Sequence, residues 1–150
     1  MVSERMGRDL SKQPVLAVML DGSDALKRSL LEFFPDAVIQ RCLVHKERNL
    51  RRYLPQKHWL RLSQLFADLR KCEGSEAASE ALESLKAFLA NNNKAARESL
   101  DEPGEELLAF FRLEVASTLN TTFLSTNIIE NAIKNLRRHI GRVCRWRDKA

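Results

Sequence analysis

Residues 14–22 read Pro14-Val15-Leu16-Ala17-Val18-Met19-Leu20-Asp21-Gly22, and this stretch decides the fold class of the chain. It is a short apolar run with branched residues that stops at an Asp-Gly pair, which is typical of a buried strand closed by a turn. A helix over residues 25–34 is expected next, because Ser23 or Asp24 can cap it and the apolar residues that follow recur at helical spacing. The strand therefore leads directly into a helix.

The same alternation is repeated once. Residues 37–42 predict a second strand, and residues 43–53 predict a helix after it. A strand, a helix, a strand and a helix in quick succession indicate an α/β unit whose two strands run parallel. A two-stranded sheet is marginal by itself, so we expect further strands beside it, from a segment that precedes this chain or from another chain.

After Pro55 the pattern becomes helical. Apolar residues recur at helical spacing around residues 59–69, 77–88 and 107–115, and no strand is expected between residues 54 and 124. A short piece at 94–100 leads to Pro103, which suits the first turn of the third helix. The fold class is therefore α/β but predominantly helical. Its three expected parts are a partial α/β core at 1–54, a helical segment at 55–122, and a final helix with a basic tail at 123–150.

Composition sets the broad class of protein. The 150 residues are 44% hydrophobic and 30% charged, which fits one soluble domain or a part of a larger one. The polar start lacks the apolar core of a signal peptide, and no apolar run approaches the roughly 20 residues of a membrane span. We therefore expect a cytoplasmic protein with reduced cysteines and no membrane partner.

The positive charge is concentrated in two places. The net charge is +5, and acids outnumber bases between residues 73 and 106. The first cluster contains Arg41, Lys46, Arg48, Arg51 and Arg52, and the second contains Lys134, Arg137, Arg138, Arg142, Arg145, Arg147 and Lys149. Two basic clusters indicate a polyanion partner, although ordinary solvated faces would give the same pattern.

The final helix combines one acid with the second basic cluster. Its expected apolar face contains Ile129, Ala132, Ile133, Leu136 and Ile140, and the opposite face contains Glu130, Lys134, Arg137, Arg138 and Arg142. Asn127 stands in the position of an N-cap, so Glu130 falls in the first turn. A carboxylate beside cations suits metal-assisted chemistry on a phosphate backbone, but a capped surface helix with an ordinary Glu130–Lys134 pair has the same sequence.

Asp21 is the other candidate acid. It directly follows a strand, and functional groups in α/β sheets gather at the carboxyl ends of strands. The alternative is an Asp-Gly turn in which the carboxylate bonds only to nearby backbone. Asp21 and Glu130 are stronger candidates as a pair, because a compact α/β fold can bring the two element ends together.

Cys42 and His45 have a spacing compatible with metal binding. A structural zinc ion needs four ligands, usually from two such pairs, and the remaining His and Cys residues form no second pair. We therefore expect no zinc. The sequence also lacks a strained nucleophile turn and a glycine-rich phosphate loop, so we expect no small-molecule substrate.

Three stretches, in their order and separation, resemble the Mutator-type family of bacterial insertion-sequence transposases. They are Val18-Met19-Leu20-Asp21-Gly22 with the helix to Pro35, Gln40-Arg41-Cys42-Leu43-Val44-His45-Lys46-Glu47-Arg48-Asn49-Leu50, and Ser125-Thr126-Asn127-Ile128-Ile129-Glu130 with Leu136-Arg137-Arg138. The second is similar to the family's Cys-x-x-His signature, and the third to its Glu-bearing helix. The resemblance extends over nearly all of residues 14–147.

The resemblance implies a partial RNase H-like catalytic core with an all-helical insertion before the final helix. It implies a triad of two Asp and one Glu that binds two Mg²⁺ or Mn²⁺ ions. Asp21 matches the second Asp and Glu130 matches the Glu, as catalytic residues and metal ligands. Cys42 and His45 match the signature near the site, and its role stays open.

No residue in this chain matches the family's first Asp, since Asp9 follows no strand. The resemblance thus implies the C-terminal part of a bacterial transposase, inactive alone, whose full-length form is a homo-oligomer bound to nucleoid DNA. The expected DNA contacts are Arg41, Lys46, Arg48, Lys134, Arg137, Arg138 and Arg142. The alternative is a non-catalytic, basic helical module that binds DNA or regulates transposition.

Overall fold

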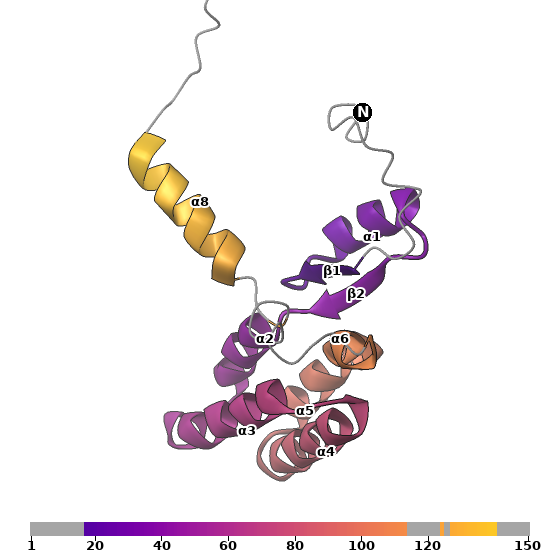
Figure 1. Ribbon diagram of the computed structural model, residues 1–150. Coiled ribbons are helices and arrows are strands. Elements are labelled where there is room, and N and C mark those ends of the chain that lie inside the picture. Colours follow the sequence, from indigo (N-terminus) through magenta and orange to yellow (C-terminus); the bar gives the residue numbers. More distant parts are fainter. Residues whose placement is uncertain (1–16, 114–123, 125–126, 141–150) are drawn as a thin grey trace, which may run out of the picture.

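A computed structural model describes residues 17–113, Leu124 and residues 127–140. A small α/β unit precedes a group of packed helices, and a last helix extends away from both (Figure 1). The elements in chain order are β1 (Ala17–Leu20), α1 (Asp24–Phe33), β2 (Val38–Arg41), α2 (Leu43–Leu50), η3 (Arg51–Tyr53), η4 (Gln56–His58), α3 (Trp59–Lys71), α4 (Ser75–Asn92), α5 (Lys94–Asp101), η5 (Gly104–Leu107), α6 (Ala109–Arg112) and α8 (Asn127–Ile140).

The two strands form the sheet that the sequence predicts. They pair in parallel, with Ala17 opposite Val38 and Leu20 opposite Arg41. The N–H of Cys42 donates to the carbonyl of Leu20 at 2.8 Å, which continues the pairing one step past β2. The α/β class, the strand–helix–strand order and the predominance of helix are therefore confirmed for the described residues.

The turn between β1 and α1 requires glycine. Gly22 has a φ of +119°, a conformation that L side chains rarely adopt. A Cβ atom at this position would also lie 2.5 Å from Nη1 of Arg41. Ser23 then caps α1, because its Oγ accepts a hydrogen bond from the N–H of Leu26 at 3.3 Å. The expected cap is thus confirmed, and of the two candidates it is Ser23.

Helix α1 exposes its apolar face. None of its residues is buried, and the side chains of Leu26 and Phe33 are 53% and 73% exposed. Leu30 and Leu31 are half-buried, so the described residues cover this face only in part. The α/β unit therefore contributes little to the core.

The core lies in the helices that follow. Its buried side chains come from α2, α3, α4, α5, η5 and α6, and from Leu124. The largest fully buried hydrophobic ones are Leu43, Leu50, Leu62, Phe66, Leu69, Leu85, Leu89, Leu100, Leu107 and Leu124. No strand occurs in the described part of the region between residues 54 and 113, as predicted. No helix of the described chain has both the length and the apolar surface needed to cross a bilayer.

Two details differ from the sequence prediction. The piece at 94–100 is a helix, α5, whose cap Asn93 accepts a hydrogen bond from the N–H of Ala96 at 2.9 Å. The single helix expected from Pro103 onward is instead η5 followed by α6, with a break at Leu108. The far end of that predicted helix, at Val115, lies outside the described residues.

The fully buried side chain of Gln40 bonds to the backbone on both sides of the break at Leu108. Its Nε2 donates to the carbonyls of Arg41 and Leu107, each at 2.9 Å, and its Oε1 accepts from the N–H of Phe110 at 2.9 Å. The Leu107 carbonyl and the Phe110 N–H would otherwise join a continuous helix. One side chain thus replaces a helical step and fastens β2 to η5 and α6.

Glu47 fastens α2 to α3 in a similar way. Its Oε1 accepts from Arg51 and Ser63, both at 2.8 Å, and its Oε2 accepts from Arg70 at 3.2 Å. Burial by itself raises the pKa of Glu47, but the hydrogen bonds from these three residues outweigh it and hold the pKa below its ordinary value of 4.5. Glu47 is therefore ionised at neutral pH.

We expect Gln40→Ala to lower the free energy of unfolding by about 2–3 kcal/mol, because it removes buried hydrogen bonds to the Leu107 carbonyl and from the Phe110 N–H. Urea denaturation followed by circular dichroism measures the change. Gln64→Ala is the matched control, since Gln64 is exposed on α3 and its loss should change stability by less than about 0.5 kcal/mol. Equal losses in the two variants would show that the buried amide contributes nothing.

The lowered pKa of Glu47 predicts a pH-dependent stability. The stabilisation is present above the ordinary value of 4.5 and is lost as the pH falls through the lower folded-state pKa. We therefore expect the wild type to be about 2 kcal/mol more stable than Glu47→Gln at about pH 7, and the difference to shrink on acidification below 4.5. Urea titrations at several pH values test this, with exposed Glu32→Gln as the control. A difference that stays constant with pH would contradict it.

Candidate functional site

Asp21 lies at the carboxyl end of β1, as the strand pattern predicts, and its side chain is exposed. Its Oδ1 accepts a hydrogen bond from the N–H of Ser23 at 3.3 Å. This is the local bond of an Asp-Gly turn, which was the alternative reading of this residue. One such bond does not use up a carboxylate, because an ionised group has about four acceptor sites.

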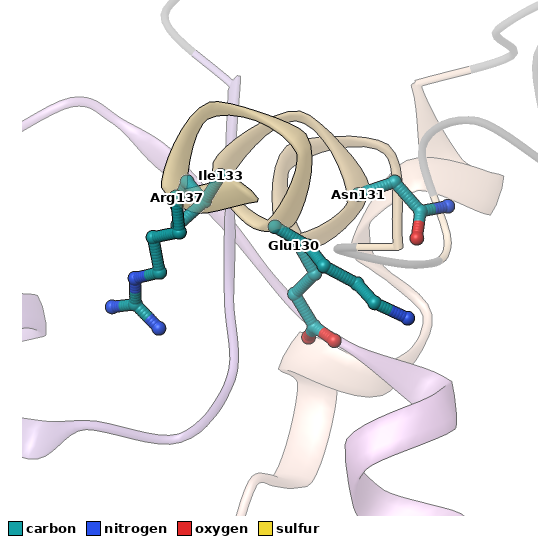
Figure 2. A pocket seen from close by; sticks show the side chains of 5 residues that line it. Glu130, Asn131, Ile133 and Arg137 are labelled. Atoms are coloured by element: carbon teal, nitrogen blue, oxygen red, sulfur yellow. The ribbon is translucent and has the colours of Figure 1, made fainter. Parts of the chain in front are cut away.

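Glu130 lies in the first turn of α8. The helix begins at Asn127 itself, so this residue occupies the first helical position rather than the one before it. The Oε1 atom of Glu130 is 2.5 Å from Nε2 of His45, and the Glu130 side chain is 44% exposed. Figure 2 shows the carboxylate projecting away from the axis of α8. The Glu130 side chain is therefore partly exposed to solvent and also contacts His45 on α2.

Residues 42–45 lie at the start of α2, directly after β2. The Cys42 side chain is fully buried, whereas His45 is partly exposed in the first helical turn. The structure thus brings His45 to Glu130, which is far away in the sequence, while the Cys42 thiol points into the interior. Among the side chains that the structure describes, no three from His, Cys, Asp and Glu gather as a metal site requires.

Two of the expected DNA contacts are internal. The side chains of Arg41 and Lys46 are only 8% and 7% exposed, and both bond to Glu102, at 2.8 Å and 3.0 Å. Arg41 also approaches Glu106 at 3.4 Å, and Lys27 pairs with the same acid. Arg41 and Lys46 are therefore poor candidates for DNA contacts, because a buried cation that is already paired is not available to a phosphate.

The ion pairs with Arg41 and Lys46 also lower the pKa of the Glu102 carboxylate. Burial by itself raises the pKa of Glu102, but the hydrogen bonds and charges of Lys46 and Arg41 outweigh it and hold the pKa below its ordinary value. Sequence reasoning missed Glu102, Glu106, Gln40 and Glu47. The excess of acids between residues 73 and 106 was the available signal for the first two, but their partners belong to β2 and α2, which only the fold brings near.

The remaining basic residues lie on the surface. Arg48 is exposed on α2, and Lys134, Arg137 and Arg138 are exposed on α8. A pocket of about 550 Å³ lies beside α8 (Figure 2), and its lining residues are Glu130, Asn131, Ile133, Lys134 and Arg137. Arg142, the last expected contact, lies outside the described residues. One acid and two cations therefore share the wall of one open pocket.

The apolar face of α8 is exposed as well. The side chains of Ile133 and Leu136 are 43% and 57% exposed, and Ala132 is exposed beside them. The helix extends from the rest of the chain near the start of α2 (Figure 1). The division of α8 into an apolar and a basic face stays a prediction, because Ile133 shares the pocket wall with Glu130, Lys134 and Arg137. The described apolar residues of α8 are all exposed.

Comparison with known proteins identifies the family of the chain. Residues 7–148 match the family described as the Mutator family of transposases. A curated relative, the transposase for insertion sequence element IS905 of Lactococcus lactis subsp. lactis (strain IL1403), is 29% identical over 126 residues, or 84% of this chain. The chain spans about a third of that relative's length, 32%. The chain belongs to the Mutator family of transposases.

Proposed function

We propose that this chain is the C-terminal part of the catalytic domain of an insertion-sequence transposase, with Asp21 and Glu130 as two of its three metal-binding acids. The observation that carries the proposal is the bond between His45 and Glu130, 2.5 Å long, which joins two of the three stretches on which the resemblance rests. The position of Asp21 at the carboxyl end of β1 supports it. The parallel strands are compatible with an RNase H-like core, and the described helices between residues 56 and 112 with an insertion into it.

The residues present fit a hard divalent cation. The carboxylate oxygens of Asp21 and Glu130 are donors of the kind that Mg²⁺ and Mn²⁺ prefer. When bound, a pair of such ions activates the attacking hydroxyl and stabilises the leaving oxygen in DNA cleavage and strand transfer. Asp21 and Glu130 would each contribute carboxylate oxygens as ligands of such an ion. Two acids do not complete a three-acid site, so we propose that this chain alone is inactive.

DNA is the proposed partner, at the transposon end and at the target. Arg48, Lys134, Arg137 and Arg138 are exposed and would contact phosphates. Such contacts position DNA without reading its sequence. We place the protein on the nucleoid in the bacterial cytoplasm, and we propose that the full-length protein is a homo-oligomer.

A second candidate function is a non-catalytic DNA-binding or regulatory module. The observation that favours it is that the described side chains contain no group of three metal-binding residues. A module of this kind would bind DNA through its basic residues and respond to salt, but not to divalent ions. A remnant of the catalytic site would bind Mn²⁺ through Asp21 and Glu130.

The metal distinguishes the two functions. We expect the purified chain to bind Mn²⁺, measured by calorimetry, and we expect the double variant Asp21→Ala, Glu130→Ala to lose that binding. The matched control is Glu32→Ala with Asp36→Ala, which removes two other exposed acids. We also expect no Mg²⁺-dependent nicking or joining of duplex DNA by the chain alone. Mn²⁺ binding that survives the double change would refute the site, and detectable nicking would refute the inactivity.

The basic face of α8 predicts a salt-dependent affinity. We expect replacement of Lys134, Arg137 and Arg138 by Gln to weaken binding to duplex DNA and to reduce the slope of log affinity against log salt by about three, one for each lost phosphate contact. Fluorescence anisotropy at several salt concentrations measures the slope. The control replaces Lys57, Arg61 and Lys71 by Gln. These residues are exposed on the helical segment, and their replacement removes the same amount of charge. Equal slopes for the two variants would place the DNA elsewhere.

A further inference from the structure

Residues 42–45 make contacts to both segments that carry the candidate acids. The N–H of Cys42 donates to the carbonyl of Leu20 at 2.8 Å, directly before Asp21. The N–H of Leu43 donates to the carbonyl of Leu124 at 3.1 Å, in the segment that leads to α8. Two adjacent amides therefore join the end of β1 to the approach of the last helix.

These backbone bonds are held in the interior. Cys42 and Leu43 are fully buried, and Leu20 and Leu124 are 6% and 1% exposed. Bonds between groups removed from water are rigid, because breaking one leaves a buried polar group unsatisfied. The backbone of residues 42 and 43 is thus held in place by buried hydrogen bonds to Leu20 and Leu124.

His45 lies in the first turn of α2, shortly after these two residues. Helix α2 is anchored on one side by the bonds of Glu47 to α3 and on another by the pair between Lys46 and Glu102. Helix α8, in contrast, is exposed at every residue from 130 to 138. The contact of His45 with Glu130 therefore joins a well-anchored helix to an exposed one.

The chemistry of the contact sets its direction. When the Glu130 carboxylate is ionised it can only accept hydrogen bonds, and Nε2–H of His45 is then the donor to Oε1 of Glu130. A carboxylate has about four acceptor sites, so it can accept a hydrogen bond from His45 and also bind a cation. Partners of this kind fix the geometry of metal-binding groups without touching the metal.

We propose that His45 is a positioning residue for Glu130, and that residues 42–45 are the brace that holds the Asp21 segment and the Glu130 helix in place relative to each other. His45 acts on the position of the acid and contacts neither metal nor DNA. The consequence for metal affinity rests on the proposed function, in which Glu130 is a ligand. The consequence for the position of α8 does not depend on the proposed function.

The first measurement needs no metal. Amide hydrogen exchange by NMR on the full chain follows residues 131–135, in the first turns of α8. We expect His45→Ala to speed exchange there by on the order of tenfold, because a charge-assisted hydrogen bond is lost. We expect His45→Gln to restore most of the protection, since its amide N–H donates from a similar place. His58→Ala is the control, because His58 packs on Phe88 in the helical group, and it should leave α8 unchanged.

The second measurement is the affinity for Mn²⁺. We expect His45→Ala to weaken it by about 10–100-fold and His45→Gln to recover it. In a Glu130→Ala background, His45→Ala should have no further effect on exchange. If the wild type binds no Mn²⁺ while the exchange effects hold, the proposed metal site is wrong and the positioning role stands. If His45→Ala exchanges like the wild type, or if His45→Gln behaves like His45→Ala, the positioning role is wrong.

Discussion

The fully buried amide of Gln40 holds the two parts of the described chain together. It belongs to β2, yet it binds the carbonyl of Leu107 and the N–H of Phe110 in the helical group. A buried amide is stable only when its donors and acceptor are satisfied, and here the partners come from both parts. The α/β unit has little core of its own, so this connection gives the strands a fixed place on the helices.

The residues around Gln40 extend the same connection. Arg41 and Lys46 bond to Glu102, and the Arg41 guanidinium also lies against Gly22 in the turn after β1. Charges that a basic sequence suggests for DNA are used here inside the protein, where leaving one unpaired would be costly. Of the cations expected to contact DNA, Arg48 and three residues of α8, Lys134, Arg137 and Arg138, are exposed. This separation of internal and external cations gives the proposed DNA surface a definite place.

The candidate site combines a rigid side with an exposed side. Asp21 and His45 come from elements tied to the interior through Leu20, Cys42 and the ion pairs of α2. Glu130 comes from a helix whose apolar residues Ile133 and Leu136 remain uncovered. A site divided in this way depends on a few contacts across the division, and the bond between His45 and Glu130 is one of them. This is the physical reason for giving the Cys-x-x-His stretch a positioning role.

The sequence by itself determined the order and type of most elements, because apolar spacing, caps and turn residues act locally. Both strands, their parallel pairing and a cap at Ser23 or Asp24 were predictable from the sequence. The motif around Asp21, residues 42–45 and Glu130 was also enough to indicate the transposase family. Only the tertiary structure decided which polar residues are partners. Gln40 bonds across the break in a predicted helix, Glu102 pairs with two predicted DNA contacts, and His45 contacts Glu130. The sequence could not predict these contacts, because each partner lies far away in the chain and no local pattern encodes it.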